Sequence, residues 1–157
     1  MTRADIARLL AFVQESPRNS NKGRWVEALQ RIGETDPGQP WCACFVMAVL
    51  DIDYQGKSPL LTTASCEQIY EAAKANGWLT RDPQPGDIFL EINASGAAHH
   101  TGIVENVADG IFHEISGNTN DDGSREGYGV FEKDLRISDL IAFVHLPETG
   151  ALSAVYA

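Results

Sequence analysis

The sequence lacks an apolar run long enough to cross a membrane, and it is poor in basic residues and in cysteine. Against 22 Asp and Glu it carries 12 Lys and Arg, which gives a net charge of −10 at pH 7. Binding to nucleic acid or to an anionic membrane needs clustered positive charge. We therefore expect no nucleic-acid partner and no membrane insertion, and any contact with an acidic polymer must be local.

The cysteines do not form a disulfide framework. Three cysteines cannot all pair within one chain, and Cys42 and Cys44 lie two residues apart on a predicted helix, where they point to different faces. We expect reduced thiols, with Cys44 and Cys66 in structural positions. No Cys and His spacing matches a zinc site, so we expect no metal and no other cofactor.

An acidic stretch over residues 118–123 is similar to the start of a calcium-binding loop. Gly129 stands where a bidentate glutamate would have to close such a loop, so we interpret the stretch as a turn between strands. His113 and His145 lie in predicted strands, and we interpret them as half-buried strand residues rather than metal ligands.

The length of 157 residues fits one domain with a hydrophobic core. Residues 1–15 predict an amphipathic helix rather than a secretory signal, because Asp5 and Arg8 interrupt the apolar stretch. We expect a single domain over residues 1–157, with its core at about 22–146 and a tail over 147–157. We also expect a monomer made in the cytoplasm without a signal peptide.

Predicted helices come first along the chain and predicted strands follow. The helices are expected over residues 3–15, over about 22–32 with Trp25, Val26, Leu29 and Ile32 facing inward, over 40–50, and from Ser65 to about Ala75. The strands are expected over residues 88–92, 100–106, 110–116, 128–132 and 140–146. This order predicts an α+β fold, with helices on one side of a curled antiparallel sheet.

Residues 38–50 form the stretch around which the chain is organised. A Gly/Pro-rich loop leads into an apolar helix there, and Cys42 lies at the junction. Pro40 and Trp41 fit a first helical turn, since the fixed φ of proline suits a position whose N–H has no helical partner. The partial positive charge of a helix start favours a thiolate, so Cys42 is a candidate nucleophile at the start of a central helix.

Two later stretches supply the partners that a thiolate nucleophile requires. His100 begins a predicted strand, and Asn118 follows the end of the next one. An imidazole takes the proton of the thiol and later protonates the leaving amine, and a third polar group fixes its tautomer and orientation. His99 points to the opposite face of the strand from His100, so only one of the two can meet Cys42.

Four blocks together resemble the CHAP amidohydrolases and peptidases, relatives of the NlpC-type cell-wall peptidases on a papain-like fold. The blocks cover residues 38–46 (GQPWCACFV), 85–89 (PGDIF), 100–105 (HTGIVE) and 117–120 (GNTN). The resemblance implies a papain-like α+β fold with Cys42 as nucleophile, His100 as general base and acid, and Asn118 as the residue that orients the imidazole.

The chain departs from the family pattern next to Asn118. The family often has a glutamate two residues before the asparagine, whereas this chain has Ser116. We expect Asn118 to orient the imidazole, with Ser116 as second candidate; Glu114 shares a face with Ser116 and is a third. The backbone N–H of Cys42 is the natural oxyanion donor.

Two residues just before Cys42 are further candidates. By analogy with papain-like sites, the Gln39 side chain is a candidate second donor to the oxyanion. Trp41 either lines the cleft or anchors the helix in the core, and we favour the core.

The resemblance also implies a peptidoglycan substrate, cut at the amide between muramic acid and L-alanine or within the stem peptide or cross-bridge. Such a protein acts on the cell wall after release or injection, as a phage lysin or as an antibacterial effector with an immunity protein as partner. Two alternatives remain open. One is a cysteine peptidase or amidase of this fold with a non-wall substrate, and the other is a non-catalytic wall-binding module.

Overall fold

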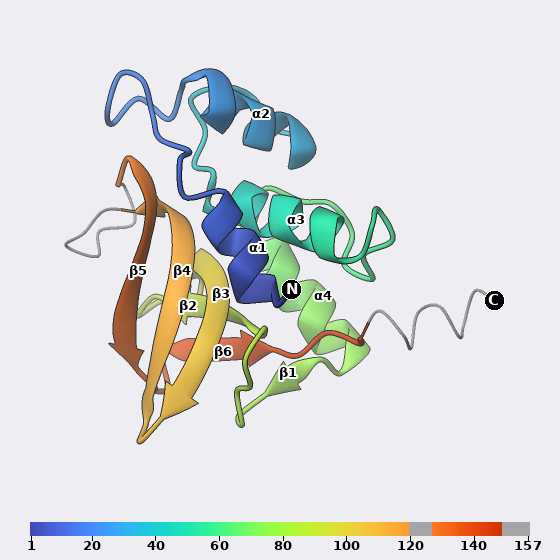
Figure 1. Ribbon diagram of the computed structural model, residues 1–157. Helices are drawn as coiled ribbons and strands as arrows, with labels where there is room; N and C mark the ends of the chain where they lie inside the picture. The colour runs from blue at the N-terminus through green and yellow to red at the C-terminus, as the bar shows by residue number, and fades with distance from the viewer. Residues whose placement is uncertain (120–126, 149–157) are drawn as a thin grey trace.

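The computed structural model describes residues 1–119 and 127–148. Most of the turn predicted over 118–123, and the tail from residue 149 onward, therefore lie outside the described residues. Within the described residues, four helices precede six strands, which is the predicted order of helices and strands with one strand more than the five expected (Figure 1). In the described part of the chain, no helix combines the length and the apolar character that a membrane span requires.

The helices are α1 (Arg3–Leu9), α2 (Arg24–Ile32), α3 (Cys42–Asp53) and α4 (Cys66–Asn76). Helix α4 follows its prediction closely, because the Ser65 side chain accepts a hydrogen bond from the Gln68 N–H and Gly77 ends the helix in the left-handed region. Helix α1 is shorter than predicted and ends at Leu9. The inward face expected for α2 is partly wrong: Val26 and Leu29 are buried, whereas Trp25 and Ile32 are 46% and 40% exposed.

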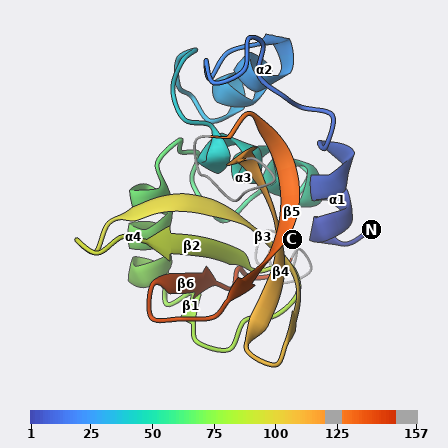
Figure 2. The same cartoon turned by 90° about the vertical axis from the view of Figure 1, so that its left-hand side faces the viewer.

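The strands are β1 (Leu79–Thr80), β2 (Ile88–Ile92), β3 (Ala98–Ala108), β4 (Ile111–Thr119), β5 (Gly129–Arg136) and β6 (Ile141–Val144). They form one antiparallel sheet in the order β1-β6-β2-β3-β4-β5. The sheet curls strongly, so that β4 and β5 run steeply across the direction of β2 and β6 (Figure 2). The two-residue strand β1 is absent from the prediction, because a segment this short leaves no alternation in the sequence.

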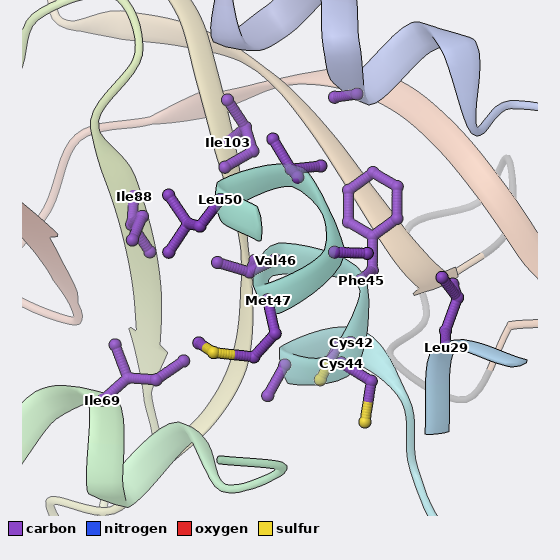
Figure 3. Packing of buried hydrophobic residues seen from close by; sticks show 14 of the residues in the cluster. Leu29, Cys42, Cys44, Phe45, Val46, Met47, Leu50, Ile69, Ile88 and Ile103 are labelled. Carbon is purple, nitrogen blue, oxygen red and sulfur yellow. The ribbon is translucent and has the colours of Figure 1, made fainter. Parts of the chain in front are cut away.

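Helix α3 is the centre of the molecule. All its residues from Cys42 to Leu50 are buried, and it packs against β3 and β4 on one side and against α1 and α2 on others. In Figure 3, Leu50 lies toward Ile88 and Ile103 of the sheet, and Met47 lies toward Ile69 of α4. The α+β arrangement with helices on a curled antiparallel sheet confirms the predicted fold class and agrees with a papain-like fold.

Candidate active site

Cys42 is the first residue of α3, with Trp41 as the N-cap. The helix therefore begins two residues later than the first turn expected at Pro40. The first N–H groups of a helix have no acceptor within the helix, and their dipoles favour a negative charge. The position of Cys42 thus favours its thiolate, and the residue is 4% exposed.

The imidazole of His100 lies between a thiol and a hydroxyl. Its Nε2 is 3.1 Å from the Ser116 Oγ, its buried Nδ1 has no hydrogen-bond partner within ordinary distance among the described residues, and Cys42 is near enough to act on the pKa of the ring. Burial lowers the pKa of His100, but the interaction with Cys42 raises it, and the pKa ends above its ordinary value. The structure thus brings Cys42, His100 and Ser116 together and favours an imidazolium beside the sulfur.

Two glycines make this juxtaposition sterically possible. A Cβ at Gly102 would lie 2.6 Å from the Cβ of Ser116, so glycine leaves the room in which the serine approaches His100. A Cβ at Gly117 would lie 2.7 Å from the Trp41 ring, so glycine lets the start of α3 pack onto β4. Close packing around Cys42 and His100 thus explains why glycine stands at positions 102 and 117.

Glu114 extends the polar cluster inward from Ser116. The carboxylate is fully buried on β4, and its Oε1 lies 3.4 Å from the Nζ of Lys133. Burial raises the pKa of Glu114 to about 7, although Lys133, His100 and the Ser116 hydroxyl favour the charged form. Ser116 therefore lies between the imidazole and a carboxylate that titrates near neutral pH.

Asn118 holds the loop that precedes the nucleophile. Its Oδ1 accepts a hydrogen bond of 2.8 Å from the Trp41 backbone N–H, and its Nδ2 donates to the Gly127 carbonyl at 3.0 Å and to Asn21 Oδ1 at 3.2 Å. The residue has φ +59°, a left-handed conformation that asparagine tolerates better than most residues. The hydrogen bond to the imidazole comes from Ser116, and Asn118 acts on the loop next to Cys42.

The two remaining predicted residues lie in that same loop. Trp41 is fully buried, and its Nε1–H donates to Glu15 at 2.9 Å, so the structure places its side chain in the core. Gln39 is exposed, and its backbone carbonyl accepts a hydrogen bond from the Gln30 side chain at 2.9 Å.

Cys66 is the site residue that the sequence did not reveal. It is the first residue of α4, and its sulfur lies 3.7 Å from the sulfur of Cys42. A separation of 24 positions along the chain gave no spacing that pointed to a pair. The position of Ser65 and Gln68 was the one available signal, since it placed Cys66 at a helix start.

Two of the other histidines, His113 and His145, form separate ion-pair groups. His113 lies on β4 with its Nε2 2.9 Å from Glu132 and its Nδ1 2.7 Å from Asp134. Glu105, His113 and Glu132 could together hold a metal ion, but the guanidinium of Arg8 already contacts both glutamates. His145 bonds Asp87 at 2.6 Å.

Hollows on the surface are distributed around the molecule. Cavities of about 530 and 730 Å³ are lined by residues away from the Cys42 cluster. A groove of about 340 Å³ lies beside the start of α4, lined by Gly33, Glu34, Thr35, Thr62, Thr63, Ala64, Ser65 and Gln68. This groove reaches Ser65, the residue that precedes Cys66 at the start of α4.

Comparison with known proteins gives a match to a sequence family and matches to solved structures. The CHAP domain matches residues 34–118, which is more than half of the chain. A solved structure titled "The crystal structure of Ly7917" is 18% identical, with a TM-score of 0.47 over 78% of this chain and 62% of that chain. No curated protein matches. On the strength of the sequence match, this chain belongs to the CHAP family of cysteine, histidine-dependent amidohydrolases and peptidases.

Proposed function

We propose that this protein hydrolyses an amide bond of peptidoglycan, with Cys42 as the nucleophile and His100 as the proton carrier. The observation that carries the proposal is the buried His100 imidazole, held through Nε2 by Ser116, whose pKa is raised by the neighbouring Cys42 at the start of α3. Membership of the CHAP family supports the hydrolase class, and it supports the cell wall as the substrate.

The reaction proceeds in two steps. The Cys42 thiolate attacks the amide carbon, and the N–H groups at the start of α3 stabilise the oxyanion. The His100 imidazolium then protonates the leaving amine, which departs and leaves a thioester. Water attacks the thioester, gives up a proton to His100, and releases the carboxylic acid and the Cys42 thiolate, which restores the starting thiolate and imidazolium.

Ser116 and Glu114 orient the imidazole during this cycle. The Nε2–H of the imidazolium donates to the Ser116 Oγ, and the buried Glu114 is near enough to Ser116 and His100 for both to favour its charged form. A serine alone stabilises an imidazolium less than a carboxylate does, and Glu114 supplies that charge when it is ionised, above its pKa of about 7. In this way the chain replaces the carboxylate that the family often places at position 116. Asn118 positions the backbone of Trp41 and therefore the first turn of α3.

Digestion of purified sacculi tests the proposal. The intact protein is expected to release new amino groups, and mass spectrometry of the soluble fragments names the bond that is cut. An amidase product ends at free muramic acid and a free L-alanine amine, whereas an endopeptidase product ends within the stem peptide or cross-bridge. Cys42→Ala should release nothing, and His113→Ala is the matched control that should remain active.

An absence of new amines with every sacculus type would overturn the wall substrate. Alkylation by iodoacetamide then separates the two alternatives. Rapid alkylation of Cys42 near neutral pH, well ahead of Cys44, would favour a cysteine amidase with another substrate, and slow alkylation would favour a non-catalytic module.

The setting of the reaction is also part of the proposal. A wall hydrolase acts after release from the cell that makes it or after injection into a rival, and a holin gene or an immunity gene beside the coding sequence distinguishes these settings.

A further inference from the structure

Two helix starts meet at a pair of sulfur atoms. Cys42 is the first residue of α3 and Cys66 is the first residue of α4, and their Sγ atoms lie 3.7 Å apart. Each helix start favours a negative charge on its own cysteine, so the pair readily holds one thiolate hydrogen-bonded to one thiol. Cys42 raises the pKa of the nearby His100, and this imidazole takes up the proton that the pair releases.

We propose that Cys42 and Cys66 are a reversible redox pair, which a hydroperoxide converts into an intramolecular disulfide that switches the hydrolase off. The Cys42 thiolate attacks the peroxide, the O–O bond breaks, and the products are a sulfenic acid and hydroxide. The Cys66 thiol then displaces water from the sulfenic sulfur, and the S–S bond forms. A dithiol reductant reverses the step by thiol-disulfide exchange and is itself oxidised.

The geometry requires a small movement. An S–S bond measures about 2.05 Å, so the two sulfurs must approach by a little less than 2 Å. Both side chains stand at the first residue of a helix, where the chain is bounded by a loop on one side. We expect rotation about the two Cα–Cβ bonds, with a shift of loop residues 61–65, to supply this approach.

Cys44 lies outside this chemistry although it is two residues from the nucleophile. It is fully buried and packs against Gly33, where a Cβ would contact its side chain. Burial raises the pKa of the Cys44 thiol to about 12, so it supplies almost no thiolate at neutral pH. Oxidation is therefore directed to the pair of helix-start thiols.

The consequence for activity rests on the proposed function, whereas formation of the bond does not. The disulfide occupies the sulfur that attacks the amide, so activity falls in proportion to the linked fraction. It also protects Cys42, because a sulfenic acid that meets a second thiol does not proceed to the irreversible sulfinic and sulfonic acids.

Titration of the purified intact chain with hydrogen peroxide tests the pair. Denatured thiol counts should fall from three to one per chain, and peptide mapping without reductant should find residues 42 and 66 in one linked species. Dithiothreitol should restore both the thiols and any sacculus-hydrolysing activity. If the linked peptide forms in a protein that never cuts sacculi, the proposed function fails and the redox pair stands.

Two variants complete the test. Cys66→Ala should lose the linkage, and peroxide should then convert Cys42 into sulfinic and sulfonic acids that dithiothreitol does not reverse. Cys44→Ala is the matched control and should form the linkage as the unmodified chain does. Over-oxidised Cys42 without any linked peptide in the unmodified chain would overturn the inference, and so would a linkage that includes Cys44. This readout on the unmodified chain holds even if a variant fails to fold.

Discussion

Two histidine clusters, one around His100 and one around His113, differ in what surrounds the ring. His100 is fully buried and meets a thiol, a hydroxyl and, through that hydroxyl, one buried carboxylate. The side chain of His113 is 28% exposed and meets the partly exposed carboxylates of Glu132 and Asp134, the first of which also contacts Arg8. The pKa of each imidazole is raised in spite of burial, His100 chiefly by Cys42 and His113 chiefly by Asp134.

The difference shows that surroundings, and not the histidine itself, determine the role. Exposed ion pairs are screened by water and salt and contribute little to stability. A buried polar cluster costs desolvation energy, and such groups persist where they position chemistry. The His113 cluster contains more charged groups than the His100 cluster. Of these two histidines, however, only His100 has a thiol and a helix start beside it.

The largest expected effect separates the two clusters by activity. His100→Ala should lower kcat for sacculus hydrolysis by about 10⁴-fold or more, because it removes the proton carrier from a unit that functions as a whole. His113→Ala should leave kcat within about twofold, because that ring contacts no reacting group in the proposed site. Initial rates of amine release measure both. Equal losses in the two variants would contradict the assignment of His100.

The next effect is a pH-dependent stability caused by Glu114. Its pKa of about 7 in the folded chain lies above the ordinary 4.5, so the folded state binds the proton more tightly than the unfolded state. Stability therefore falls as the pH rises from about 4.5 to 7, on the order of 3 kcal/mol for the full shift. Glu114→Gln should not show this fall. Urea denaturation at a series of pH values gives the difference between the two proteins.

Glu132→Gln is the matched control for Glu114→Gln, because Glu132 belongs to the partly exposed cluster around His113. Hydrogen bonds from Arg8 hold the pKa of Glu132 below its usual range. The stability that Glu132 contributes is therefore present above the ordinary pKa of a glutamate and is lost as the pH falls through its lowered pKa. The change of stability with pH thus has the opposite sign to that caused by Glu114. Parallel curves for the unmodified chain and Glu114→Gln would show that Glu114 does not titrate in this window.

The sequence could single out Cys42 and His100 as candidates for nucleophile and base but not the whole environment of the ring. The Gly/Pro loop before Cys42 and the HTG segment of β3 are local signals, and the fold class follows from the order of helices and strands. The bond between Ser116 and His100 depends on the pairing of β3 with β4, including the register shift between Val104 and Asn106. Cys66 reaches Cys42 through the packing of two helix starts, and no local pattern records such a contact.

A smaller effect is expected where Asn118 supports the site. Asn118→Ala leaves the buried Trp41 N–H without its acceptor and forces alanine into a left-handed conformation. Together these should lower the free energy of unfolding by about 2 kcal/mol. Asn118→Gly relieves the backbone strain but does not restore the hydrogen bond to Trp41. Compared with Asn118→Ala, it should therefore be more stable but no more active. Full recovery of kcat in Asn118→Gly would show that the hydrogen bond to Trp41 does not position the nucleophile.

The smallest effect on stability is expected in the partly exposed cluster around His113. Arg8 bonds Glu132 at 2.9 Å and also contacts Glu105, and all three side chains are partly exposed. Arg8→Ala should therefore cost less than about 1 kcal/mol of stability, and the loss should shrink as salt is added.

The pKa of His113 is raised, so the stability that this histidine contributes is full below its ordinary pKa and is lost as the pH rises through the raised value. Removing Arg8 leaves the acidic partners of His113 uncompensated, which should raise that pKa further. An NMR titration of the His113 ring measures the shift, and a shift in the His100 ring instead would mean that the two clusters are coupled across β4.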